Sequence, residues 1–595
     1  MPHSTASAPI HYEVALHDVH AHLYRVTLTI AEPAAMQEVS LPVWIPGSYL
    51  VREFAKNLHQ LAARQNGQAC AVEQCDKHRW RIGCRPGHAL EVTYQVSAYD
   101  NSVRMAWLDH RRGFFNGTSL LLRIHNQEHL PHVLQVFQNE KYLNWQLGTA
   151  LTAIKTDDNG FGSYRAANYE ELVDAPVEMG TFWSGSFTAC GVPHRFIVAG
   201  APASFDGAQL LADTQRICET QIRLWHPQGQ APAHSHYLFM LNATHDGYGG
   251  LEHRHSTALI CNRADLPRQG AAQQADGYTT LLGLISHEYF HTWNVKRLRP
   301  AAFAPYDYNR ENYTELLWFF EGLTSYYDDL ILHRAGLIDT SAYLKLLAKT
   351  INQVLQTPGR RVQSVAQASF DAWVKYYRQD ENTANSTVSY YTKGALVGLC
   401  LDLQLRREGS SLDALMRHLW QHSPDRQVTQ ERIAASLQAL TGRHWQAEIA
   451  AWVHGTEDLP LADLLAAFGV AMDSQPAAPA QALGLRVQEG SSIAIRQVLR
   501  GGLAEQAGMM AGDEWYGLEV STDNGSQGWR IGKLDELPLY AGAARTVTAL
   551  VARDRQLLRL PLALPDPVHA EVGNVQLRTS DNPLLAQWLP APASV

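Results

Sequence analysis

The stretch GLISHEYFHTWNVKRLRP (residues 283–300) contains His287, Glu288 and His291 in the order H-E-x-x-H. The apolar residues around it recur at intervals of three and four, which predicts a helix. On a helix, residues four apart lie on one face, about 6 Å apart along the axis, so two imidazoles can bind one metal ion. Glu288 would then point toward the water on that ion. The stretch therefore predicts the zinc site of a hydrolase, although H-E-x-x-H alone also occurs by chance in long chains.

A catalytic zinc needs a third protein ligand and one open position. The chain after His291 reads TWNVKRLRP and lacks the extension that supplies a third histidine in some zinc peptidases, so the ligand must come from another element. Glu321, in WFFEGLTSYY on the next predicted helix, is the best candidate. A carboxylate among large aromatic residues costs several kcal/mol unless it is paired or bound to a metal. The alternative is a local cap or salt bridge.

Two further stretches fit the site of a zinc hydrolase. DGYGGLEH (246–253) places Glu252 after Gly249 and Gly250, and glycines let backbone approach a ligand closely. The alternative there is a simple turn before a strand. SYYTKG (389–394) places Tyr391 at the start of a predicted helix, where its phenol could donate to a developing oxyanion. A core tyrosine is the interpretation that the local sequence favours.

The composition of the chain excludes several classes of protein. The net charge of the 595 residues is −9, which argues against nucleic-acid binding because that function needs a basic surface. Seven cysteines are too sparse for a disulfide scaffold and favour reduced thiols. Cys70, Cys75 and Cys84 lie near His78 and His88, but their spacing fits no zinc-ribbon pattern. The N-terminus MPHSTASAPIHYEV has no signal-peptide features, and no apolar run is long enough for a membrane helix, so we expect a soluble, cytoplasmic protein.

The apolar pattern divides the chain into parts. Residues 1–180 alternate with period two, as in Tyr24, Val26, Leu28 and Ile30, which predicts an all-β domain. Residues 181–473 begin with strands and become helical, which indicates a mixed domain with a helical subdomain. The Pro- and Ala-rich stretch 474–482 reads as a linker. Short strands with glycine turns predict another β domain at 483–570, followed by a C-terminal tail at 571–595.

These motifs together resemble a known family. H-E-x-x-H followed by WFFEG on a second helix resembles the gluzincin zinc metallopeptidases. GGLEH resembles the G-x-M-E-N exopeptidase motif of aminopeptidase N, and YTKG resembles its Y-E-K-G. LPVWIPGSYLVREF (41–54), HTWNVKRLRP (291–300) and LAEQAGMMAGDE (503–514) are similar to hallmarks of a narrower relative, the PDZ-containing glycyl aminopeptidase family. The resemblance covers nearly the whole chain.

The resemblance implies a multidomain α+β protein: an N-terminal all-β domain, a thermolysin-like α/β catalytic domain with a helical subdomain, and a C-terminal PDZ-like β domain. It implies one Zn²⁺ per chain, bound by His287, His291 and Glu321. Glu288 matches the catalytic base, and Tyr391 matches the tyrosine that stabilises the tetrahedral intermediate. Glu252, with Gly249 and Gly250, matches the residues that hold the free amino group of the substrate. His253 stands where aminopeptidase N usually has Asn, which makes recognition of the amine less secure than the zinc site.

The sequence is compatible with three functions. The first is a zinc aminopeptidase that removes Gly, Ala or another small N-terminal residue from peptides with a free N-terminus. The second is a zinc endopeptidase in which Glu252 serves another purpose. The third is a non-catalytic scaffold that binds peptides through its PDZ-like domain. The intact set of His287, Glu288, His291, Glu321 and Tyr391 favours an enzyme over the scaffold.

Overall fold

The computed structural model describes residues 9–229, 232–271, 275–522, 525–565 and 572–590. The first eight residues, which bear on the expected absence of a signal peptide, lie outside the described residues, as do 591–595 of the expected tail. The chain forms two compact units, Met1–Tyr313 with Asp425–Gln427, and Thr314–Pro424 with Val428–Val595. In the part that the structure describes, no helix is both long and apolar enough to cross a membrane.

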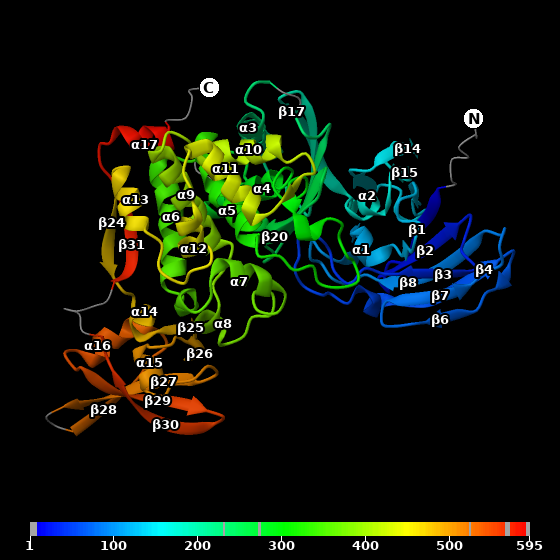
Figure 1. Cartoon of the computed structure of the whole chain (residues 1–595). Helices are drawn as coiled ribbons and strands as arrows, with labels where there is room; N and C mark the ends of the chain where they lie inside the picture. The colour runs from blue at the N-terminus through cyan, green and yellow to red at the C-terminus, as the bar shows by residue number, and fades with distance from the viewer. Residues whose placement is uncertain (1–8, 230–231, 272–274, 523–524, 566–571, 591–595) are drawn as a thin grey trace. The chain divides into compact units, whose positions relative to one another are not determined.

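The first unit begins with a β domain, as the alternating pattern predicts (Figure 1). Its largest sheet has the strand order β14 (Thr152–Thr156), β15 (Gly162–Ala166), β12 (His132–Val136), β1 (Ile10–Asp18), β2 (Leu23–Ile30), β8 (Leu90–Ser97), β4 (Leu58–Gln65) and β5 (Gln68–Ala69). Alternate residues of β2 are buried, since one face of the strand packs on the core and the other meets solvent.

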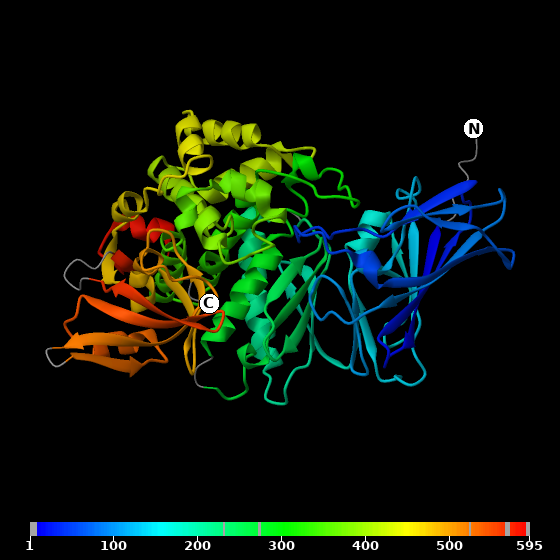
Figure 2. The same ribbon diagram turned by 90° about the horizontal axis from the view of Figure 1, so that it is seen from below.

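Two four-stranded sheets share the core of this domain (Figure 2). One has the order β13 (Gln146–Thr149), β16 (Val177–Gly180), β10 (Arg112–Phe115) and β9 (Ala106–Leu108). The other has the order β11 (Arg123–Ile124), β3 (Met36–Ser40), β7 (Arg79–Gly83) and β6 (Val72–Gln74). The same apolar core includes Leu251 and Ala258, so it continues into the next part of the unit.

The next part of the first unit is a mixed sheet with helices. The strand order is β17 (Phe182–Ala189), β18 (Val192–Ala199), β19 (Tyr237–Thr244), β21 (Ser256–Asn262) and β20 (Gly249–Glu252). The three central strands are parallel, and β17 and β20 pair antiparallel at the two edges. Helix α3 (Gly207–Trp225) contacts β17, and helix α4 (Asp276–Phe290) contacts the edge strand β20. The zinc-motif helix that the sequence predicts is therefore confirmed, and it lies against the strand that carries GGLE.

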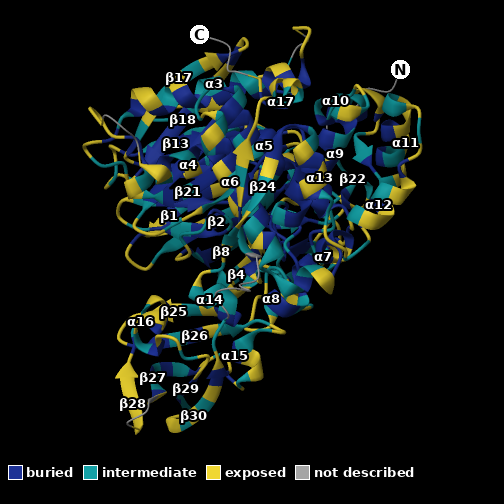
Figure 3. Cartoon of the chain, turned by 90° about the vertical axis from the view of Figure 1, so that its left-hand side faces the viewer, coloured by how far each residue is buried: buried dark blue, intermediate teal, exposed yellow. Residues whose placement is uncertain are grey.

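The second unit contains the helical region that the sequence predicts. It opens with a π-helical turn at Trp318–Gly322 that runs into α5 (Leu323–Arg334). The longer helices that follow are α6 (Thr340–Leu355), α9 (Thr392–Arg407), α10 (Leu412–His422) and α11 (Gln430–Thr441). Helix α9 is buried along most of its length, because α5, α6 and α10 all contact it (Figure 3).

The second unit ends with a β domain that has its own apolar core around Trp515, Ile493 and Leu518. Its sheet runs β25 (Leu485–Glu489), β26 (Ile493–Val498), β27 (Glu514–Thr522), β29 (Thr546–Arg553) and β30 (Gln556–Ala563). Strand β28 (Gly525–Arg530) pairs with β27 and is exposed along its length (Figure 3).

The expected linker and tail contain regular structure. Residues 474–476 end β24 (Val470–Pro476), and 479–483 form α14 (Pro479–Leu483). The expected tail supplies β31 (Val572–Thr579), which pairs with β24, and α17 (Pro583–Trp588). The reason is that β24 and β31 are about 100 residues apart and stabilise each other by pairing, so local composition carries no sign of the strands.

Candidate functional site

The two histidines of the motif converge at the end of α4. His287 lies in the last turn, and His291 is the residue that caps the helix. Their Nε2 atoms are 3.0 Å apart, and the two rings are perpendicular at 85°. Two nitrogen ligands at 2.0–2.1 Å from a tetrahedral zinc lie about 3.3 Å apart, so the observed spacing fits a shared metal ion. His291 Nδ1 lies 2.7 Å from the carbonyl oxygen of Asn294, which orients the ring and leaves Nε2 as the ligand atom.

Glu321 completes a ligand set with these histidines. One ligand atom from each of His287, His291 and Glu321 lies within 4.8 Å of the others, and among the described residues this is the group that could hold a metal ion. Glu321 is only 2 % exposed and lies in the π-helical turn that precedes α5. Such turns recur at functional sites because they redirect one side chain out of the helical register. The donor set of two imidazoles and one carboxylate is the one that catalytic zinc takes in thermolysin-type enzymes.

Glu288 lies under the glycine pair of β20. The carboxylate is buried, and a Cβ added at Gly250 would be 2.1 Å from Glu288 Oε1. Gly249 has a φ of +144°, a conformation that residues with a side chain rarely adopt. The glycine at position 250 therefore lets the strand backbone lie close to the glutamate of the zinc motif, whereas the predicted approach to a ligand stays a prediction.

Glu252 ends β20 two residues beyond Gly250 and is 4 % exposed. Its Oε1 atom has no hydrogen-bond partner among the described residues. Gly47, in the turn that joins Ile45 to Ser48, packs directly on this carboxylate, since an added Cβ would lie 2.5 Å from both of its oxygens. A buried carboxylate oxygen without a donor is costly and indicates a place for a cationic or hydrogen-bonding ligand.

A charged cluster lies beside Glu252. Lys296 Nζ donates to Asp174 Oδ1 over 2.6 Å, and His253 Nδ1 lies 3.1 Å from the same oxygen. Burial acts to raise the pKa of Asp174, but Lys296 and His253 outweigh burial and hold that pKa well below its ordinary value. Burial acts to lower the pKa of Lys296, but Asp174, Tyr306 and Glu252 outweigh it, so the pKa is raised. Lys296 is therefore a buried cation that acts on two carboxylates.

Tyr391 is the N-cap residue of α9, as the sequence predicts. Gly322 and Gly394 let this helix approach the π-helical turn, because a Cβ added at Gly322 would lie 2.6 Å from Gly394 Cα. Burial, and then the charge of Glu321, raise the pKa of Tyr391 well above its ordinary value. The phenol therefore stays protonated and can donate a hydrogen bond throughout the neutral range.

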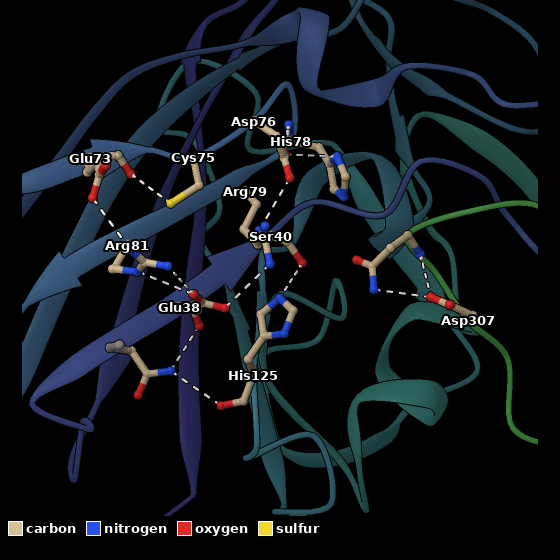
Figure 4. A network of polar contacts seen from close by, with 12 residues as sticks. Glu38, Ser40, Glu73, Cys75, Asp76, His78, Arg79, Arg81, His125 and Asp307 are labelled. Atoms are coloured by element: carbon tan, nitrogen blue, oxygen red, sulfur yellow. Dashed lines mark hydrogen bonds and ion pairs between the residues drawn. The ribbon is translucent and has the colours of Figure 1, made fainter.

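The alternative metal site in the N-terminal domain is not formed. Cys75 Sγ contacts the carbonyl oxygen of Glu73, and His78 Nδ1 lies 3.2 Å from Asp76 Oδ1 (Figure 4). Around them, Arg79 and Arg81 pair with Glu38 on the neighbouring strand β3 (Figure 4). These groups hold β3 and β7 together, and all cysteines in the described part of the chain are free thiols.

Sequence reasoning missed three residues of the site. Gly47 belongs to the WIPGSY stretch, which carried the resemblance without a role for any residue. Asp174 follows a short helix and had no local signal. Lys296 lies in the basic stretch after the zinc helix, VKRLR (295–299), where no local pattern distinguishes it from the neighbouring arginines.

Comparisons with known proteins find related families and structures. A model of the M61 glycyl aminopeptidase family matches residues 280–397, and a model of the peptidase M61 N-terminal domain matches residues 11–181. A crystal structure of an aminopeptidase N family protein from Idiomarina loihiensis is 36 % identical, with a TM-score of 0.91 over 98 % of this chain and 100 % of that chain. An M1 zinc metallopeptidase from Deinococcus radiodurans is 15 % identical, with a TM-score of 0.49 over 76 % of this chain and 95 % of that chain. No curated protein matches the sequence.

Proposed function

Because the chain belongs to the M61 glycyl aminopeptidase family and is a zinc metallopeptidase, we propose that it removes single small residues, glycine or alanine, from the free N-termini of peptides. His287, His291 and Glu321 would hold one zinc ion per chain. Glu252 would bind the α-ammonium group of the substrate. Glu288 and Tyr391 would carry out the proton transfer and the stabilisation of the oxyanion.

Each of these side chains would have a separate role in the hydrolysis. When bound, zinc polarises the scissile carbonyl and lowers the pKa of the attacking water. Glu288 takes a proton from that water and passes it to the leaving amine. The Tyr391 phenol donates to the oxygen that becomes negative, and in other enzymes the loss of one such donor costs about 2.7–4 kcal/mol of transition-state stabilisation.

The observation that carries the exopeptidase proposal is the unpartnered Oε1 of buried Glu252. An α-ammonium group would supply the donor that Oε1 lacks. Gly250, which packs on Glu288, lies two residues from Glu252 on the same face of β20. Two residues of a strand span about 6.7 Å, so there is room for about one substrate residue between the amine and the scissile carbonyl.

The preference for a small first residue has its own support. The turn Ile45–Ser48 places Gly47 against the Glu252 carboxylate and occupies the space beside it. A first residue with a large side chain would need that space. The C-terminal β domain, with β25 at the edge of its sheet, would be a PDZ-like module, since a peptide can be added to such an edge as a further strand.

Paired substrates test the proposal. Hydrolysis of glycyl and alanyl arylamides is compared with hydrolysis of their N-acetylated forms, with zinc content measured and a chelator added. We expect one zinc per chain and chelator-sensitive cleavage of the free-amine substrates alone. Cleavage of the blocked substrates at a similar rate would indicate an endopeptidase and remove the role of Glu252. Bound zinc without turnover of any substrate would indicate a scaffold.

A further inference from the structure

The second unit contains a groove of about 880 Å³ that the catalytic residues do not use. It is walled by α6, by the segment before α9, by the β24–β31 pair and by strands β25 and β26 of the C-terminal β domain. Most of its lining side chains are amides and hydroxyls, such as Asn352, Gln356, Gln497 and Thr383. These groups offer both donors and acceptors, which suits the backbone of a peptide of any sequence.

The charge of this groove is one-sided. Three cations line it, Lys345 and Lys349 on α6 and Arg486 on β25, and no described Asp or Glu lines it. The two lysines are four residues apart and so lie on one face of the helix. This is the reverse of the whole chain, in which 58 acidic residues exceed 49 basic ones.

The three cations are not neutralised by close partners. None of them forms an ion pair within 4.0 Å among the described residues. Arg486 donates only to neutral oxygens, those of Gln497 at 3.2 Å and Thr357 at 3.4 Å. Lys349 acts electrostatically on Asp329, but burial raises the pKa of Asp329 to about 7, so this carboxyl is only partly ionised at neutral pH.

The groove begins beside the catalytic tyrosine. Tyr376 lines it, and the ring of Tyr376 packs on that of Tyr391 with centroids 5.4 Å apart. Ser389 and Thr392, which flank Tyr391 in sequence, line it as well. The groove and Tyr391 are therefore separated by one side chain, that of Tyr376, within the same unit.

We propose that this groove binds the part of the peptide substrate that follows the scissile bond and that Lys345, Lys349 and Arg486 bind its free C-terminal carboxylate. The proposal rests on the proposed aminopeptidase function and adds a substrate class to it: short peptides with both termini free. Amide and hydroxyl side chains hold the backbone, which leaves the sequence unrestricted. The cations favour peptides that end within their reach.

The test uses a series of peptides, glycine followed by one to six alanines, each made as the free acid and as the C-terminal amide. The ratio of kcat/KM for the acid to that for the amide is measured at each length. We expect the ratio to pass through a maximum of about fivefold or more at one length and to fall in high salt. A Lys345→Gln/Lys349→Gln/Arg486→Gln variant should bring the ratio to about one.

Arg496→Gln is the matched control. Arg496 lies on β26 next to Gln497 and is exposed, but it does not line the groove, so this variant should keep the wild-type ratio. A wild-type ratio near one at every length, or a ratio that the triple variant leaves unchanged, would overturn the proposal. Binding of the acid and amide peptides to a Glu288→Gln variant, measured by calorimetry, tests recognition of the carboxylate separately from catalysis. Selective binding of the acid without turnover of glycyl arylamides by the wild type would remove the aminopeptidase and keep the groove.

Discussion

Two buried carboxylates of this protein differ in how well they are satisfied. Asp402, in the helical region, is fully buried and accepts hydrogen bonds from the Leu412 amide at 2.8 Å, the Tyr326 hydroxyl at 2.7 Å and Arg406 Nε at 3.0 Å. Glu252 is almost as buried, yet its Oε1 has no partner among the described residues. Satisfied acceptors stabilise a fold, whereas an unsatisfied one costs stability unless a ligand supplies the donor. The number of hydrogen-bond partners therefore distinguishes a carboxylate that stabilises the fold from one that is suited to bind a substrate.

The largest expected effect is a loss of activity, without a loss of stability, when Glu288 is replaced. Glu288→Gln keeps the size of the side chain and the three zinc ligands, but the amide cannot take a proton. We expect kcat/KM for a glycyl arylamide to fall by about 10²–10⁴, with zinc content and melting temperature unchanged. Glu315→Gln, at an exposed position, is the control and should keep full activity. Activity of the Glu288 variant within tenfold of the wild type would rule out the general-base role.

The opposite behaviour is expected at Asp402. Asp402→Ala leaves the Arg406 guanidinium and the Tyr326 hydroxyl buried without their acceptor. The free energy of unfolding should fall by about 3–5 kcal/mol, measured by urea titration, because removing one partner of a buried ion pair leaves an uncompensated charge. Activity per folded molecule should stay at the wild-type level. Asp473→Ala, which breaks an exposed ion pair with Arg578, should change stability little. Equal losses in the two variants would contradict the distinction.

Gly47 tests whether the N-terminal domain holds Glu252 in place. Gly47→Ala adds a Cβ 2.5 Å from both carboxylate oxygens, at a φ of +93°. Displacement of Glu252 should raise KM for free-amine substrates about tenfold, which is about 1.4 kcal/mol. Gly87→Ala is a matched control, because Gly87 has a φ of +78° and an added Cβ there would meet nothing within 4 Å. If both variants change KM equally, backbone strain and not contact with Glu252 is the cause.

Sequence patterns found the parts of the site that lie on single elements. His287, Glu288 and His291 follow from the helical spacing of one stretch, and Glu321 follows from an acidic residue in an aromatic helix. Gly47 could not be found in this way, because its role depends on a contact with a residue more than 200 positions away in the sequence. The same holds for the β24–β31 pair, which includes the first three residues of the expected linker. Long-range contacts leave no periodic signal in either partner.

The last comparison concerns Asp329, a carboxyl of α5 that forms no hydrogen bond or ion pair among the described residues. Burial, together with Asp328, raises its pKa to about 7. The folded protein then binds a proton that the unfolded chain has lost above pH ~4, so the contribution of Asp329 to stability falls as the pH rises from about 4 to 7.

Asp329→Asn removes this titration and should make the protein more stable than the wild type at pH ~8, by up to about 4 kcal/mol, with no difference near pH ~4. Urea unfolding at several pH values measures it. Asp473→Asn should show the opposite sign, because hydrogen bonding to Arg578 lowers the pKa of Asp473 and the ionised form is the one that stabilises the fold. If Asp329→Asn has the same effect at every pH, Asp329 is ionised in the folded protein. A buried carboxylate without a hydrogen-bond partner would then not always be destabilising. The proposal that Glu252 binds the amino group of the substrate would in that case depend on the substrate experiments alone.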